Sequence, residues 1–227
     1  MRSPTIRHTL LASFAVAAMA GFCAAPAQAG VLALFPLSSN YKATELGTNI
    51  ASATIDTGQL FEAYIGNDSF GNVAEMYPNA YGTTLQLSLA TDSYFTLNIS
   101  SNGGPLNLGE LNYSVGKGGS SDPRGYAIYD SLDGFTTALY STQLPTGANA
   151  APVPHSLTLG TSFQVAQNVS FRFYVYSPHP LNNSVDFSNI SLTTPTNNSV
   201  PEPGPLSLMA AGLLSLGLLM RRRNQRT

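Results

Sequence analysis

Short runs of alternating apolar and polar residues recur through the middle of the chain, and they constrain its fold more than any other feature. In the segment 171–176, FRFYVY, two phenylalanines and a valine alternate with an arginine and two tyrosines. Because successive side chains of a strand point to opposite faces, such a run places its apolar residues on one face of a sheet. Between residues 31 and 193 we find no long segment with helical periodicity. The pattern therefore predicts half-buried strands.

Turn-forming residues separate these runs. Glycine, proline, asparagine and aspartate gather at 103–104, 118–119, 133–134 and 145–154, where we expect turns or loops. The other alternating runs are 85–90, 93–100, 108–115, 124–131, 155–160 and 185–192. The last of them changes parity between Phe187 and Ile190, which is typical of a β-bulge. About eight to ten short strands with polar outer faces predict an all-β fold, an antiparallel β-sandwich resembling a jelly roll.

The N-terminal segment, residues 1–29, has the organisation of a secretory signal peptide. Two arginines precede an apolar stretch, and Ala27 and Ala29 form a small-x-small cleavage pattern. We expect the mature chain to begin at Gly30. The single cysteine, Cys23, lies inside the signal, so the exported body has no disulfide and no cysteine-ligated metal.

The exported body carries an excess of negative charge. Between residues 30 and 200 there are four basic and eleven acidic side chains, which gives a formal net charge of −7. Nucleic acid is therefore not an expected partner, because such a surface cannot neutralise phosphates.

A short apolar run and a block of arginines close the chain. As a helix, residues 206–220 would span about 22 Å, against roughly 30 Å for the hydrocarbon core of a bilayer. Arg221, Arg222 and Arg223 favour a cytoplasmic end by the positive-inside rule. We therefore expect a single transmembrane helix at about residues 205–220, which holds the body outside the inner membrane.

A short motif stands immediately before this run, after a polar linker at residues 194–199. Val200, Pro201, Glu202 and Pro203 form it. Together with the apolar helix and the arginine-rich end, this motif closely resembles the PEP-CTERM sorting signal of Gram-negative bacteria. The resemblance covers residues 200–226 and implies processing by an exosortase, then delivery to the cell surface or the biofilm matrix. A plain membrane anchor behind a proline-rich stalk is the alternative interpretation.

A second resemblance concerns residues 124–192. The segments RGYAIYDSLDGF, FRFYVYS and VDFSNISL are similar to those of a group of PEP-CTERM proteins whose bodies are described as jelly rolls like carbohydrate-binding modules. The two resemblances imply one β-sandwich domain, residues 30–193, in a non-enzymatic surface or extracellular-matrix protein. Its implied role is structural or adhesive, in association with exopolysaccharide.

Four tyrosines are candidates for contact with a glycan. Tyrosine rings on a sheet face can stack on sugar rings and still form hydrogen bonds. The same residues also fit a role in covering the outer sheet or pairing across strands. If they bind sugar, the chain is a carbohydrate-binding module with a specific glycan ligand, which is the alternative function. The four are Tyr126, Tyr129, Tyr174 and Tyr176.

The remaining polar residues do not form a catalytic or cofactor-binding pattern. His155 and His179 lack the context of a catalytic triad, since the chain has no nucleophile elbow. Asp130 and Asp133 fit a turn better than a pair of glycosidase carboxylates. Asp133 and Asp186 are candidate Ca²⁺ ligands only as members of oxygen-rich segments. We therefore predict no enzyme, no cofactor and no metal, with a polysaccharide hydrolase as the least favoured alternative.

Overall fold

The structure is a computed structural model, and it describes residues 29–68, 71–119, 122–147 and 149–196. Two antiparallel sheets form the compact unit Ala29–Thr196. The predicted signal sequence up to residue 28 and the predicted sorting signal at residues 200–226 lie outside the described residues. Within the described segments, no helix is long and apolar enough to cross a membrane.

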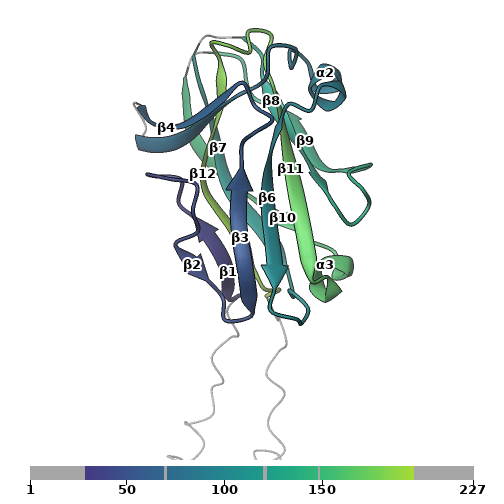
Figure 1. The fold of residues 1–227 in the computed structure, drawn as a ribbon. Coiled ribbons are helices and arrows are strands. Elements are labelled where there is room, and N and C mark those ends of the chain that lie inside the picture. Colours follow the sequence, from purple (N-terminus) through teal and green to yellow (C-terminus); the bar gives the residue numbers. More distant parts are fainter. Residues whose placement is uncertain (1–28, 69–70, 120–121, 148, 197–227) are drawn as a thin grey trace, which may run out of the picture. The chain divides into compact units, whose positions relative to one another are not determined.

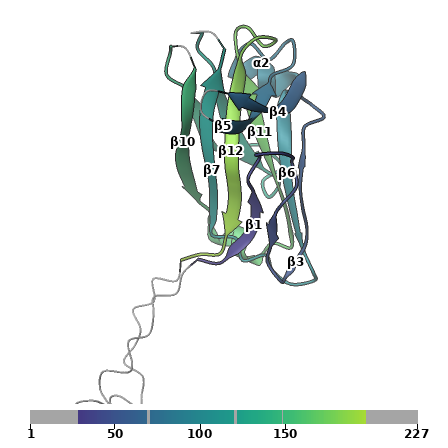
Figure 2. The ribbon, with the colours of Figure 1, turned by 90° about the vertical axis from the view of Figure 1, so that its left-hand side faces the viewer.

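Sheet A has seven strands, and β12 is its central member. One edge of β12 pairs with β7, while the other pairs first with β5 and then with β1. Figure 2 shows β10, β7 and β12 side by side. The strands are β1 (Val31–Phe35), β2 (Glu45–Leu46), β4 (Glu62–Asp68), β5 (Gly71–Tyr77), β7 (Glu110–Gly118), β10 (Ala150–Thr158) and β12 (Ser184–Thr193).

Sheet B has five strands in the order β3-β6-β11-β8-β9, and two short helices flank it. Helix α2 (Leu85–Ala90) and helix α3 (Thr161–Val165) lie at opposite ends of β11 (Figure 1). The strands are β3 (Ile50–Asp56), β6 (Tyr94–Ser101), β8 (Gly125–Asp130), β9 (Ala138–Gln143) and β11 (Asn168–Tyr176).

The apolar faces of the predicted strands pack against each other in one core between the sheets. The ring of Phe173 on β11 stacks on Phe95 of β6, with 4.5 Å between ring centroids. Phe187 of β12 meets these two rings edge-on at 5.6 Å and 5.1 Å. All three side chains are fully buried. Aromatic contacts across the two sheets therefore hold the sandwich together, as the alternation predicted.

The predicted change of phase near the end of the domain is confirmed. The register of β12 against β7 shifts between Ser188 and Ser191, and Asn189 adopts a φ of 51°. Phe187 and Ile190 on either side of the shift are both fully buried. A bulge is thus what keeps the apolar residues of β12 on the inner face.

Two predictions about local structure are wrong. The run 85–90 is not a strand but helix α2, whose N-terminus is capped by the side chain of Thr84. Ser88 is its buried residue, and the hydroxyl donates to the carbonyl of Val175 at 2.8 Å. The predicted loop 145–154 also ends early, because β10 begins at Ala150. β10 is an edge strand, so its two prolines can lack an N–H without removing a bond from the ladder.

Candidate functional site

The outward side chains of sheet B form rows across the strands. Asp56 of β3, Thr96 of β6, Arg172 of β11 and Tyr129 of β8 pair in register and make one such row. A flanking row holds only hydroxyl and amide side chains, namely Thr54, Asn98 and Ser170. This face is therefore polar, with one cation near its middle.

Aromatic rings surround that cation. The guanidinium carbon of Arg172 lies 3.9 Å from the ring centroid of Phe135 and 4.5 Å from that of Tyr94. Tyr174 meets Tyr94 edge-on at 4.9 Å and Tyr129 at 5.4 Å. We call these five residues the aromatic–arginine cluster. Each contact between a cation and a ring face is worth about 0.5–1 kcal/mol at an exposed site.

The cluster keeps hydrogen-bond donors available. Arg172 donates to the Tyr174 hydroxyl at 3.4 Å, and among the described residues no carboxylate lies within ion-pair distance of its guanidinium. Burial raises the pKa of the Tyr94 phenol, and the charge of Arg172 opposes this shift. The phenol is therefore protonated at neutral pH, and it can donate as well as accept.

A tight turn places Phe135 over Arg172. Phe135 has a φ of 61°, and its N–H donates to the backbone carbonyl of Asp130 at 2.8 Å. The carboxylate of Asp133 accepts from the N–H groups of Thr136 and Thr137 at 3.1 Å and 2.8 Å. Desolvation acts to raise the pKa of Asp133, but these hydrogen bonds outweigh it and hold that pKa below its ordinary value. The two aspartates thus shape the turn.

The four tyrosines predicted from the sequence are not equivalent. Tyr129 and Tyr174 belong to the cluster, although Tyr174 is only 4% exposed. Tyr176 lies over Gly125, where a Cβ atom would come within 2.5 Å of the tyrosine Oη. Tyr126 is fully buried and donates to the Tyr113 hydroxyl at 3.2 Å. The prediction of a glycan contact at Tyr126 is therefore wrong. Tyr126 lies on the inward-facing side of β8, together with Ile128, and its ring is in the core.

Sequence reasoning missed three members of the cluster. Tyr94 shares the outward parity of Thr96 on β6, so the alternation could have revealed it. The alternation puts Arg172 on the outer face, but nothing in the sequence indicates a binding role for it. Phe135 lies in a turn, where no periodicity reports the direction of a side chain.

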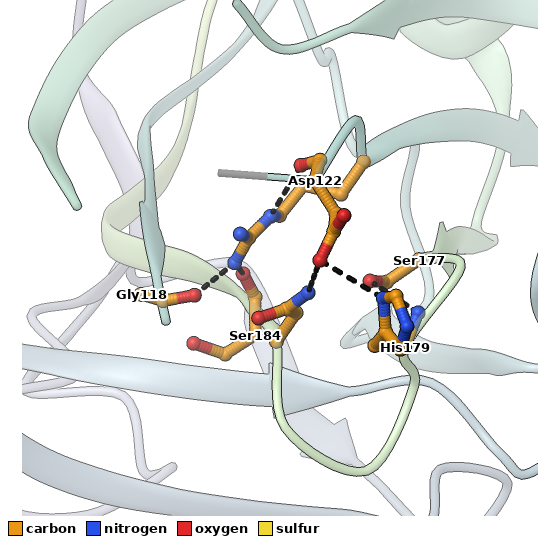
Figure 3. Close-up of polar contacts among 7 residues, drawn as sticks. Gly118, Asp122, Ser177, His179 and Ser184 are labelled. Atoms are coloured by element: carbon orange, nitrogen blue, oxygen red, sulfur yellow. Dashed lines mark hydrogen bonds and ion pairs between the residues drawn. The ribbon is translucent and has the colours of Figure 1, made fainter. Parts of the chain in front are cut away.

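A separate polar network joins the segment before β8 to the segment before β12 (Figure 3). Asp122 Oδ2 lies 2.9 Å from Nδ1 of His179 and accepts from Nδ2 of Asn183 at 3.2 Å. The hydroxyl of Ser177 accepts from the backbone N–H of His179, not from its imidazole. A catalytic triad needs the serine hydroxyl on the imidazole. The network therefore fits a role in tying the two segments together.

Arg124 forms the buried part of this network, and its Nε donates to the backbone carbonyl of Asp122. The residue is fully buried, and its Nη1 donates to the backbone carbonyls of Gly118 and Ser184. Burial lowers the pKa of Arg124, whereas the charges of Asp186 and Asp122 act to raise it. Asp186, one of the two candidate Ca²⁺ ligands, thus faces a cation. Among the described residues, no group of three or more His, Cys, Asp or Glu could hold a metal ion.

The second histidine, His155, lies on β10. It pairs with Tyr113 of β7, and the two rings stack with 5.5 Å between centroids and 14° between planes. His155 is therefore part of the packing between two neighbouring strands.

Comparisons with known proteins concern the fold. No family model matches the chain, and no curated protein matches it. Among solved structures, the cleaved adhesin domain of Lys-gingipain from Porphyromonas gingivalis has 14% identity and a TM-score of 0.40, over 63% of this chain and 92% of that one. A family 29 carbohydrate-binding module has 10% identity and a TM-score of 0.38, over 78% and 97% of the two chains. Such a distant likeness does not identify a ligand.

Proposed function

We propose that this chain is an exported, non-enzymatic, jelly-roll-like β-sandwich protein that binds polysaccharide on the outer face of sheet B. The aromatic–arginine cluster is the observation that carries the proposal. Aromatic ring faces contact the apolar faces of sugars, while phenols and a guanidinium donate to sugar oxygens. The cluster combines these groups on one sheet face.

The geometry around Arg172 supports this role. Two rings hold the guanidinium in place, and within the described chain its side chain donates only to Tyr174. A fixed donor loses little conformational entropy when a ligand binds. The row formed by Thr54, Asn98 and Ser170 continues the polar face. A polymer could therefore meet the cluster and this row together.

The test is retention of the purified full-length chain on the polysaccharide secreted by its native cell, with and without Ca²⁺. We expect saturable retention, and Tyr129→Ala and Arg172→Gln should each weaken it about tenfold, the equivalent of about 1.4 kcal/mol. Tyr64→Ala is the matched control, because Tyr64 is an exposed tyrosine on β4 of sheet A. Equal retention of all variants would mean that the cluster only covers the sheet. No retention at all would favour a protein partner or a structural coat role.

We also propose that the chain is sorted by its C-terminus. The motif at residues 200–203, the apolar run and Arg221–Arg223 support this part of the proposal. The mass of the protein isolated from the cell surface tests it. A mature chain that begins at Gly30 and lacks the arginine-rich end agrees with exosortase processing, whereas an intact C-terminus indicates a plain anchor.

A further inference from the structure

Two adjoining cavities lie on the outer face of sheet A, the opposite sheet from the cluster. Their volumes are about 340 Å³ and 610 Å³, and they share Ser114 and Asn189 in their walls. They lie over β10, β7 and β12, which Figure 2 shows side by side. We call the two cavities together the sheet A groove. Its main polar lining residues are Asn72, Asn112, Ser114, Ser156, Ser188 and Asn189.

Within the described part of the chain, the hydrogen-bonding groups of these side chains have no protein partner. None of the six amide and hydroxyl side chains makes a hydrogen bond to another described residue. Among the described residues that line the groove, none is Asp, Glu, Lys or Arg. The polar lining thus consists of amides and hydroxyls, which can both donate and accept, together with the imidazole of His155.

The bulge in β12 places an amide at the centre of the groove. Asn189 adopts a φ of 51°, and its N–H donates to the carbonyl of Pro36 at 3.2 Å. This is the point at which β12 exchanges its partner β5 for β1. Bulges and left-handed residues are often found where a sheet directs a side chain toward a ligand.

The floor of the groove determines how a ligand can be recognised. Strand β7 is paired along one edge with β10 and along the other with β12. A peptide added as a further strand needs an unpaired strand edge. A ligand lying over β7 must therefore be recognised by side chains.

We propose that the sheet A groove binds a neutral oligosaccharide, independently of the aromatic–arginine cluster. Asparagine and serine side chains donate and accept, as sugar hydroxyls do. The rings of Pro152 and Pro154 supply apolar walls for the C–H faces of a sugar. The groove offers no lysine or arginine to an anionic chain, and the formal charge of −7 between residues 30 and 200 repels one.

The experiment is calorimetric titration of the full-length chain with linear β-1,4-linked hexasaccharides of glucose, mannose and xylose, and with α-1,4-linked hexagalacturonate. We expect at least one neutral hexasaccharide to bind and the acidic one not to bind. Asn189→Gly should weaken binding about tenfold, the loss expected for one or two hydrogen bonds. Glycine retains the left-handed backbone and removes only the amide. Ser114→Ala, at a residue shared by both cavities, provides a second variant and should also weaken binding.

Hydrogen exchange with bound hexasaccharide gives the location without any substitution. Protection should appear at the amides of residues 112–116, 155–156 and 188–190 and of Val153, since Pro152 and Pro154 have no N–H. Tyr64→Ala, at an exposed tyrosine of β4 that does not line the groove, serves as the matched control and should leave this binding unchanged. If no neutral hexasaccharide binds, or if Tyr129→Ala abolishes binding while Asn189→Gly does not, the groove is not the site. Preference for hexagalacturonate would overturn the proposal too. The polysaccharide test on sheet B can succeed or fail separately from each of these results.

Discussion

Replacing Arg124 by methionine should be among the most destabilising changes in the domain. Methionine keeps much of the apolar stem but removes the guanidinium, so the buried carbonyl of Ser184 and the half-buried carbonyl of Gly118 lose a donor. Asp186 is 1% exposed, and its charge acts to raise the pKa of Arg124. The substitution therefore also removes the cation that faces this buried carboxylate. Removing one partner from a buried ionic network costs about 3–5 kcal/mol, since the remaining charge stays buried.

The assay is urea and thermal denaturation of the wild type, Arg124→Met and the control Arg172→Met. In a domain of this size a loss of 3–5 kcal/mol corresponds to a decrease in Tm of roughly 6–20 °C. Arg172→Met removes an arginine that packs on two half-buried rings, and it should cost only about 1–2 kcal/mol. If Arg124→Met costs less than about 1 kcal/mol, or no more than the control, then solvent or a rearranged network replaces the guanidinium. The reasoning from burial would then be refuted.

Three further predictions concern the core and the two ends of the pH range. Phe173→Ala, which removes a fully buried ring stacked on Phe95, should lower the free energy of unfolding by about 3–5 kcal/mol in the same assay. The pKa of Asp133 is lower in the folded than in the unfolded chain, so the ionised carboxylate stabilises the fold. This contribution to the free energy of unfolding is complete above the ordinary aspartate pKa, near 3.9, and is lost as the pH falls through the folded pKa. The Tm difference between wild type and Asp133→Asn should therefore narrow below about pH 4, and a constant difference would contradict this. Burial raises the pKa of Tyr113 to about 12. The contribution of its neutral phenol to the free energy of unfolding is therefore complete below the ordinary tyrosine pKa and is lost as the pH rises through about 12. Ultraviolet titration of Tyr113→Phe should show one late-titrating phenol fewer than wild type, and an unchanged late step would exclude the assignment.

Periodicity was sufficient to predict the fold class because inner and outer residues of the sheets differ so clearly. Along β6 and β11 the phenylalanines and leucines face the core, and polar residues alternate with them. Even the bulge in β12 was visible, since the core requires both Phe187 and Ile190 on one side. The order of the strands could not be predicted in the same way, because the alternation within one strand does not indicate which strands pair with it.

Helix α2 shows where periodicity misleads. Leu85, Leu87 and Leu89 alternate like a strand, but Leu87 is 45% exposed and Ser88 is the buried residue. A polar residue on the inner face hides a helical pattern, and six residues are too few to distinguish the two periods. Ser88 is buried because its hydroxyl donates to carbonyls of neighbouring segments. That tertiary reason is not encoded locally.

The candidate sites were predictable only in part, for a similar reason. The outward parity of β11 indicated Tyr174 and Tyr176, but exposure depends on what lies above them. The rings of Tyr94 and Tyr129 contact Tyr174, which is only 4% exposed. Phe135 and Asn189 owe their positions to left-handed backbone conformations in a turn and a bulge. The positions of these side chains depend on how the sheets assemble, and the local sequence does not indicate that.

The two proposed sites differ in chemistry because the two sheets leave different side chains outside. Sheet B presents aromatic rings around a cation, whereas the described residues that line the sheet A groove offer amides and hydroxyls and include no Lys, Arg, Asp or Glu. Since the outer faces of a sandwich point in opposite directions, one short glycan segment cannot occupy both. A domain with two such sites would connect separate segments, and linked sites hold a polymer more strongly than either does alone. A cross-linking assay distinguishes binding at both sites from binding in the groove alone. Turbidity with a long neutral polysaccharide should require both Tyr129 and Asn189. Binding of a hexasaccharide in the groove should require only Asn189.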